Sequence, residues 1–174
     1  DGFAQLIQAI QIEHKKHYGT CDDLLIGLQL THSGRYSKPD PDNKPKPRIL
    51  YHHPILDKRH KIENNENCIF TDDEIDELIE DFVRSAKMAA DVGFEFVDLK
   101  HCHGYLGHEF LSARTREGKY GGSFEKRARF PLEVIQAVKR LAGADFPVIY
   151  HLSAEEDVPN GVDLEEAVKF AKLA

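Results

Sequence analysis

The sequence feature that most constrains the fold is a short apolar run that ends in a cluster of titratable side chains. Residues 94–99 are mostly apolar, and Lys100, His101, His103 and Tyr105 follow at once. In an α/β barrel the catalytic groups lie at the carboxyl ends of the strands, because side chains from several strands converge there on one cavity. We therefore predict a strand over the apolar run and an active site where it stops.

Two further apolar runs alternate with helical patterns along the chain. Residues 24–30 form a near-continuous apolar run with one large polar member, Gln29, and residues 147–152 form another. Such runs are typical of parallel strands that are covered on both faces. Helical spacing is present at residues 3–16, at 71–93, from about 125 and from 163. The order predicts consecutive βα units, and hence an α/β fold with right-handed crossovers.

The segment at residues 38–70 has a different composition. It is rich in Pro, Lys, Asp, Asn and His, which is too polar for a core and is punctuated by residues that break regular structure. We predict one long loop here, and long loops in compact domains are often lids or binding loops. Thr71 and Glu74 then form a capping box that begins the next helix, and Gly93 ends it.

Composition sets the broad class. With 174 residues, 41% of them hydrophobic and 30% charged, the chain has the composition of a globular domain. A net charge of -7 and a pI near 5.8 give no electrostatic footprint for nucleic acid or an anionic membrane. The three cysteines lack a C-x-x-C spacing, which favours a reducing, cytoplasmic location. No apolar run approaches membrane length, and because the chain starts at Asp1 without a methionine, we expect a cut N-terminus.

Three motifs carry a resemblance to a known family. They are LQLTHSGR at residues 28–35, VDLKHCHGYLGHEFLS at residues 97–112 and KYGGSFEKRARF at residues 119–130. In these motifs the chain resembles the NADH:flavin oxidoreductase or Old Yellow Enzyme family, which are FMN-dependent (β/α)8 TIM barrels. The resemblance implies strands matching the third to fifth of such a barrel. A whole barrel needs about 250 residues, so residues 1–174 are expected to be a single incomplete domain that contains the loop at 38–70.

The resemblance also implies roles for particular side chains. Gln29 matches the residue that hydrogen-bonds the pyrimidine edge of the flavin, and His151 lies where the family has an arginine near the same ring. Tyr105 matches the family's proton donor, and His103 matches a residue that hydrogen-bonds the substrate oxygen. The implied reaction passes hydride from NAD(P)H through FMN to an activated alkene or a related small-molecule substrate. The structural alternatives are a Gln29 that is satisfied by the barrel backbone and a Tyr105 that is packed under the loop.

Lys100 departs from the family pattern, which usually has a histidine at that position. A lysine carries full positive charge and would favour a carboxylate or enolate oxygen on the substrate. The alternative is a salt bridge to a neighbouring acid. Two other functions stay open on this residue and on His151: a Schiff-base lyase that uses Lys100 as its amine nucleophile, or a flavin-binding paralogue without turnover.

We predict no metal site. His101, His103 and His108 cluster in sequence, but a strand sends alternate residues to opposite faces and no acidic third ligand is fixed nearby in sequence. The histidines at residues 52–60 are interpreted as part of a solvated loop. Open sheet edges of a partial barrel would favour association, so a homo-oligomer is possible.

Overall fold

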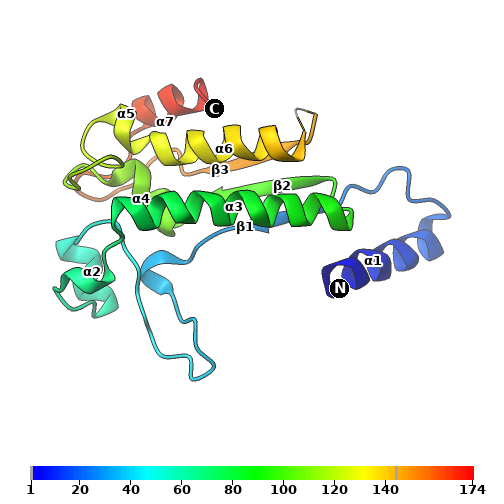
Figure 1. Cartoon of the computed structure of the whole chain (residues 1–174), viewed down its shortest axis with the longest axis horizontal. Helices are drawn as coiled ribbons and strands as arrows, with labels where there is room; N and C mark the ends of the chain where they lie inside the picture. The colour runs from blue at the N-terminus through cyan, green and yellow to red at the C-terminus, as the bar shows by residue number, and fades with distance from the viewer. Residues whose placement is uncertain (1, 144) are drawn as a thin grey trace.

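The computed structural model describes residues 2–143 and 145–174. Its elements, in chain order, are α1 (Gly2–Tyr18), β1 (Gly27–Leu30), η1 (Gly34–Tyr36), α2 (Pro54–His60), η2 (Glu66–Cys68), α3 (Asp72–Val92), β2 (Phe96–His101), α4 (Leu106–Ser112), α5 (Phe124–Arg127), α6 (Arg129–Ala142), β3 (Val148–Leu152) and α7 (Leu164–Ala171). The labels η1 and η2 mark 3-10 helices. Figure 1 shows the sheet lying behind α3 and α6, with α1 at one end of the molecule.

The three strands form a parallel sheet in the order β1-β2-β3. Gln29 pairs with Asp98 across the first two strands, and Lys100 pairs with His151 across the last two. Consecutive parallel strands in this order are joined by α3 and by the segment containing α4, α5 and α6. The predicted α/β fold with parallel βα units is confirmed.

Helices α3 and α6 cover one face of the sheet and build the core with it. Val97 and Leu99 of β2 are fully buried on that face. They pack with apolar side chains of both helices, including Ile79, Phe82 and Val134. Burying one such side chain stabilises the fold by about 1.5–3 kcal/mol. The apolar alternation of the strand therefore decides which face is covered.

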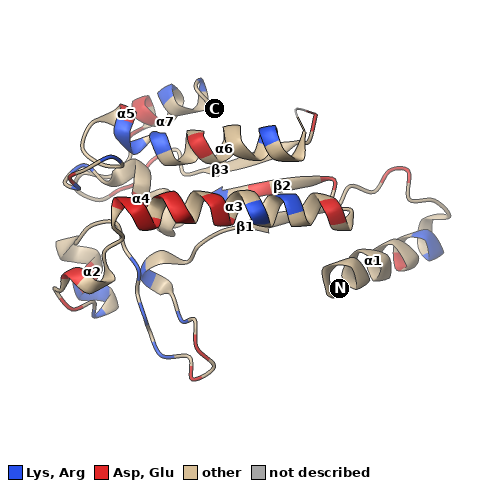
Figure 2. Cartoon of the chain, viewed as in Figure 1, with Lys and Arg blue, Asp and Glu red and all other residues tan. Residues whose placement is uncertain are grey.

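Helix α3 begins and ends where the sequence predicts. Thr71 is its N-cap, and the reciprocal hydrogen bonds between Thr71 and Glu74 form the capping box. Acidic side chains fill the first turn, where they interact favourably with the helix dipole (Figure 2). Gly93 has a φ of 103°, the left-handed conformation that a glycine adopts at no steric cost. The chain then turns directly into β2.

The structure corrects several predicted elements and boundaries. The segment at 38–70 is not without secondary structure, since it contains α2 and η2, and α2 is capped by the side chain of His53. Helix α4 was not predicted, because its seven residues are buried on all sides and show no helical periodicity. The helix expected from about residue 125 is two consecutive helices, α5 and α6. Strand β1 starts only at Gly27, and β2 continues to His101.

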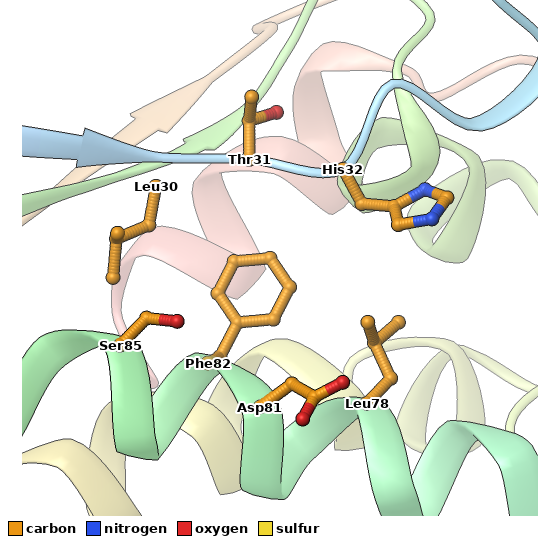
Figure 3. Close-up of a pocket in the computed structure, with 7 residues that line it drawn as sticks. All are labelled: Leu30, Thr31, His32, Leu78, Asp81, Phe82 and Ser85. Atoms are coloured by element: carbon orange, nitrogen blue, oxygen red, sulfur yellow. The ribbon is translucent and has the colours of Figure 1, made fainter. Parts of the chain in front are cut away.

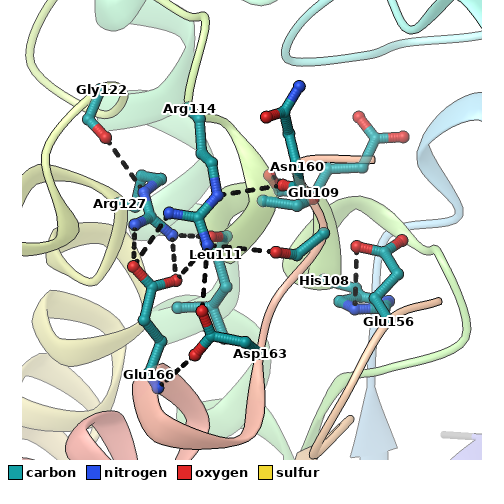
Figure 4. A network of polar contacts seen from close by, with 12 residues as sticks. His108, Glu109, Leu111, Arg114, Gly122, Arg127, Glu156, Asn160, Asp163 and Glu166 are labelled. Atoms are coloured by element: carbon teal, nitrogen blue, oxygen red, sulfur yellow. Dashed lines mark hydrogen bonds and ion pairs between the residues drawn. The ribbon is translucent and has the colours of Figure 1, made fainter. Parts of the chain in front are cut away.

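Helix α7 is tied to the preceding segment by an ion-pair network around Glu166 (Figure 4). Arg114 donates to both carboxylate oxygens of Glu166, at 2.7 and 3.0 Å. Arg127 also donates to both, at 2.6 and 3.0 Å, and its side chain is buried. Glu125 of α5 accepts a hydrogen bond from Lys169 of α7. These contacts give Arg127 and Glu125 a structural role, because they join α5 to α7.

No helix in the described ranges is long and apolar enough to cross a membrane.

Candidate active site

The second face of the sheet carries polar side chains from all three strands. Gln29 of β1, Asp98 and Lys100 of β2, and His151 of β3 share this face, because side chains alternate along a strand and neighbouring partners point the same way. We call it the polar face. In the described part of the chain no helix packs over it (Figure 1). The residues predicted to contact flavin therefore lie together on one surface.

Asp98 joins the two predicted flavin-contacting residues, and the sequence interpretation missed it. Gln29 donates from Nε2 to Asp98 Oδ2 at 2.7 Å, and His151 Nδ1 lies 2.6 Å from Asp98 Oδ1. The carboxylate is buried although its face is open, because these two side chains flank it. Its spacing of two residues from Lys100 was the available signal, since that spacing places both on one face of a strand.

Lys100 and Tyr105 are in direct contact at the carboxyl end of β2. The ammonium nitrogen of Lys100 lies 3.9 Å from the centroid of the Tyr105 ring, which is a cation–π contact. The sequence predicted that Lys100 follows the strand, but Lys100 lies within β2. Among the residues that the structure describes, no carboxylate pairs with Lys100. The salt bridge that the sequence left open is absent there, and the side chain keeps a charge without a counter-ion.

Tyr105 continues into a row of rings that leads to the long segment after β1. Its ring centroid lies 5.4 Å from that of Tyr36, which lies 4.6 Å from that of His60 in α2. Tyr36 is partly exposed. The row places His60, and with it part of the segment at 38–70, beside the candidate site.

His103 is placed differently from its predicted partners. It has a φ of 59°, which is unusual for a residue with a side chain, and Gly104 follows with a φ of 69°. The Nδ1 atom of His103 lies 3.2 Å from the sulfur of Cys102. Within the described residues, no hydrogen bond or ring contact joins its imidazole to Lys100 or Tyr105.

His101 belongs to the covered face, although it stands in the same cluster of sequence. Its side chain is fully buried, and its Nδ1 lies 2.5 Å from the hydroxyl of Tyr150. Burial, with a smaller effect of the nearby His108, lowers the pKa of His101 to about 3. The imidazole is therefore neutral and structural. The titratable cluster at the end of β2 divides between the two faces of the sheet.

A buried ion-pair network anchors the segment at 38–70. Arg35 donates to Glu109 of α4 at 2.6 Å and to Asp57 of α2 at 2.8 Å, and Glu109 also accepts from the backbone of Leu50. Burial raises the pKa of Glu109 to about 7, against the lowering effect of Arg35. His52 pairs with Asp57 at 2.6 Å. The interpretation as a solvated loop was wrong for His52, which joins this network, and for His53, which is buried and caps α2.

A separate cavity opens on the helix side of β1 (Figure 3). Leu30, His32 and Phe82 are among the residues that line it. It lies between β1 and α3, on the face opposite Lys100, so it is distinct from the candidate site. The described ranges hold no group of three or more His, Cys, Asp or Glu side chains arranged to bind a metal ion.

Comparison with known proteins defines the class. The model of the NADH:flavin oxidoreductase / NADH oxidase family matches residues 2–174, and the chain belongs to that family. Members of this family are NAD(P)H:flavin oxidoreductases, whose cofactors are FMN and NAD(P)H.

Particular relatives agree with this class. The chain is 33% identical over 174 residues to an NADPH dehydrogenase from Bacillus velezensis, covering 99% of this chain and 46% of that protein. It is 46% identical over 105 residues to an NADH oxidase from Thermoanaerobacter brockii, covering 59% of this chain and 16% of the relative. The chain thus spans less than half the length of these relatives.

Solved structures confirm the fold type. A morphinone reductase structure superposes with a TM-score of 0.63 at 29% identity, covering 84% of this chain and 44% of that one. A 2-naphthoyl-CoA reductase superposes with a TM-score of 0.69 at 26% identity, covering 84% of this chain and 24% of that one. These neighbours are of TIM-barrel type, so the predicted partial match to a barrel is supported.

Proposed function

We propose that the complete protein is an FMN-dependent oxidoreductase of ene-reductase type, which reduces an activated alkene or a related small molecule with electrons from NAD(P)H. The observation that carries this proposal is the contact between Lys100 and Tyr105 at the carboxyl end of β2, beside the polar face. In a barrel, that end is where active sites lie. A cation and a phenol side by side suit a reaction in which an oxygen gains negative charge and a carbon receives a proton.

The polar face suits the flavin ring. FMN, when bound, accepts hydride from the nicotinamide and passes it to the substrate. Gln29 has one amide hydrogen and its carbonyl oxygen left after its bond to Asp98, which is the paired donor and acceptor that a flavin imide requires. His151 is held on the same face by the same carboxylate. Both side chains are exposed, so they are free to contact a ring laid against the sheet.

Tyr105 and Lys100 would act on the substrate. The phenol of Tyr105 is the group proposed to donate a proton to the substrate carbon next to the one that receives hydride. The ammonium of Lys100 would bind a substrate carboxylate or enolate oxygen, because no protein carboxylate in the described ranges neutralises it. His103 is proposed as a second donor to that oxygen. Its present contact with Cys102 means that its ring would have to turn toward the substrate.

Relatives of this chain support oxidoreduction over the other two functions. Their names are NADH oxidase, NADPH dehydrogenase and 4,4'-dithiodibutanoate disulfide reductase, and the solved neighbours include two reductases and a histamine dehydrogenase. No contact of Lys100 favours a Schiff-base lyase. A paralogue without turnover would bind flavin but would not pass its electrons on, which the following experiment measures.

The test replaces Tyr105 with phenylalanine in the complete, FMN-loaded protein. Reduction of an activated alkene by the reduced flavin should fall by about 10²- to 10⁴-fold, the usual contribution of a general acid. Flavin reduction by NAD(P)H should persist, because the ring and its contacts with Lys100 remain. Stopped-flow absorbance at the flavin band follows the two half-reactions separately.

Tyr36→Phe is the matched control, since its ring packs on Tyr105 but its hydroxyl is not the proposed donor. It should leave both half-reactions within a few-fold of the wild type. Equal loss in both half-reactions of Tyr105→Phe would assign that residue to packing and refute its role as donor. A protein that takes up FMN but shows no electron transfer in either half-reaction would refute the proposed function itself.

A further inference from the structure

We infer that His108, in the neutral form that carries its proton on Nε2, is a positioning residue for Tyr105, and that Glu156 holds it from the loop before α7. This inference rests on the proposed function, because it gives the turn before Tyr105 a role in proton donation. His108 itself touches neither Tyr105 nor the proposed substrate region. Its contacts run through the turn at residues 103–105.

The first step is the assignment of the proton on the ring. The backbone N–H of Gly104 donates to His108 Nδ1 at 2.8 Å. A backbone amide can only donate, so Nδ1 must be the unprotonated nitrogen of the ring. The remaining proton of the neutral imidazole is then on Nε2. The bond to Gly104 therefore specifies one tautomer.

The second step concerns the buried atoms on the other side of the ring. His108 is 4% exposed, and its Nε2 has no hydrogen-bond partner among the described residues. Glu156 Oε2 is also buried without a partner, and it lies 3.6 Å from this Nε2 (Figure 4). We treat this donor and acceptor as a hydrogen-bonding pair, because both lack other partners and a small shift brings them to bonding distance. Glu156 thereby orients the ring whose other side holds Gly104.

The third step is the conformation of the turn. His103 and Gly104 are both in the left-handed region, with φ of 59° and 69°. A histidine adopts this conformation only where the surroundings hold it, and the bond from Gly104 to His108 is such a restraint. Tyr105 follows directly as the residue that precedes helix α4, on which His108 lies. The imidazole thus closes a short loop between the start of the helix and the turn that presents the phenol.

Protonation of His108 would undo this arrangement. The imidazolium carries a proton on Nδ1, so it can no longer accept from Gly104. Burial lowers the pKa of His108, and nearby His103 adds to this, while Glu156 opposes it. The charged or titratable groups that face the ring are Glu156, His103 and, from β2, His101. The neutral form is consistent with the observed bond.

Ring nitrogen NMR of the 174-residue chain tests the anchor without flavin. The spectrum of neutral His108, assigned by its loss in His108→Gln, should show an unprotonated Nδ1 and a protonated Nε2. The amide of Gly104 should exchange with solvent at least about 10-fold faster in His108→Leu than in the wild type. A protonated Nδ1, or exchange that does not change, would overturn the inference.

Kinetics of the complete, FMN-loaded protein test the consequence for Tyr105. His108→Leu should slow substrate reduction by about 10- to 100-fold, the scale of a catalytic group displaced by about 1 Å, and leave flavin reduction within twofold. His108→Gln should recover most of this loss, because its amide oxygen can accept from Gly104. Substrate reduction should also fall in the wild type as acidic pH protonates His108, but not in His108→Gln.

The outcomes separate this inference from the proposed function. Equal rates of substrate reduction in His108→Leu and His108→Gln, or a fall at acidic pH that is the same in the wild type and His108→Gln, would overturn the positioning role. If His108→Leu does not fold, the pH comparison with His108→Gln still decides. If Tyr105→Phe is without effect, the proposed function fails, while the NMR result for His108 stands by itself.

Discussion

The two faces of β2 carry side chains of different kinds in different surroundings. Leu99 and His101 point toward α3 and α6 and are completely buried. Asp98 and Lys100, their immediate neighbours, point to the polar face, where Asp98 binds residues of both adjacent strands. One short strand therefore carries the core and the candidate chemistry in alternation. A cluster of polar residues in such a strand cannot be assigned to one site by its position in sequence.

Two histidines show the same difference most directly. The side chain of His101 is fully buried, with its pKa lowered to about 3, whereas the side chain of His151 is 56% exposed. The first packs edge-on to Tyr150 of β3, and the second is held by a carboxylate of β2. Residue type alone would have given both the same function. The two histidines lie on opposite faces of the sheet, and this position gives them different functions.

The largest difference between the faces is expected in stability. Leu99→Ala on the covered face should lower the free energy of unfolding by about 2–5 kcal/mol, because it leaves a cavity among side chains that cannot collapse around it. Ile149→Ala is the matched control on the polar face, where Ile149 is 45% exposed, and it should cost about 1 kcal/mol or less. Urea unfolding of the 174-residue chain measures both. Equal costs would mean that the polar face is packed as a core.

The second prediction concerns acid. Burial lowers the pKa of His101 in the folded chain to about 3, from about 6.5 for an ordinary histidine, so between these values the unfolded chain binds a proton that the folded chain excludes. Its contribution to stability is therefore complete above about pH 6.5 and is lost as the pH falls. The loss should reach about 3 kcal/mol at pH 4.5, from 1.36 kcal/mol for each unit of pH.

Urea unfolding at several pH values compares the wild type with His101→Leu, which removes this titration. The variant should lack that part of the acid slope, even if its stability at pH 7 is lower. A wild type and His101→Leu with the same slope would contradict the neutral, buried state of His101.

The smallest expected effect, about 2 kcal/mol, is on substrate preference. Lys100→Met in the complete enzyme should reduce kcat/KM for a carboxylate-bearing alkene about 30-fold relative to a neutral enone, the scale of a charge-assisted hydrogen bond. Stability should change little, because Lys100 has no ion-pair partner among the described residues. The measurement is kcat/KM for the two substrates side by side.

Lys100→His is the companion variant. It should move the preference toward the neutral enone, because it replaces a fixed charge with a neutral donor. If both variants lose stability and keep the wild-type preference, Lys100 belongs with Leu99 as a structural residue. The contrast between the two faces of β2 would then fail at this position.

Local signals predicted the elements that have clear periodicity or caps. The capping box of Thr71 and Glu74 and the glycine at residue 93 bounded α3 correctly. Helix α4 had neither signal, because its short buried segment includes Glu109, which is polar but lies in the core against Arg35. Local sequence patterns do not indicate a buried ion pair between Arg35 and Glu109, because the two residues are far apart in the sequence. The same two side chains also hold the segment at 38–70, since Arg35 donates to Asp57 of α2 and Glu109 accepts from the backbone N–H of Leu50.

The sequence by itself determined the class of fold, the family and the order of the strands, because apolar periodicity and the three motifs depend only on neighbours along the chain. Only the tertiary structure decided which members of the polar cluster meet. It brought Lys100 to Tyr105, turned His101 into the core, and joined Gln29 to His151 through Asp98. These contacts follow from strand register and side-chain direction, which bring together residues distant in sequence and separate adjacent ones.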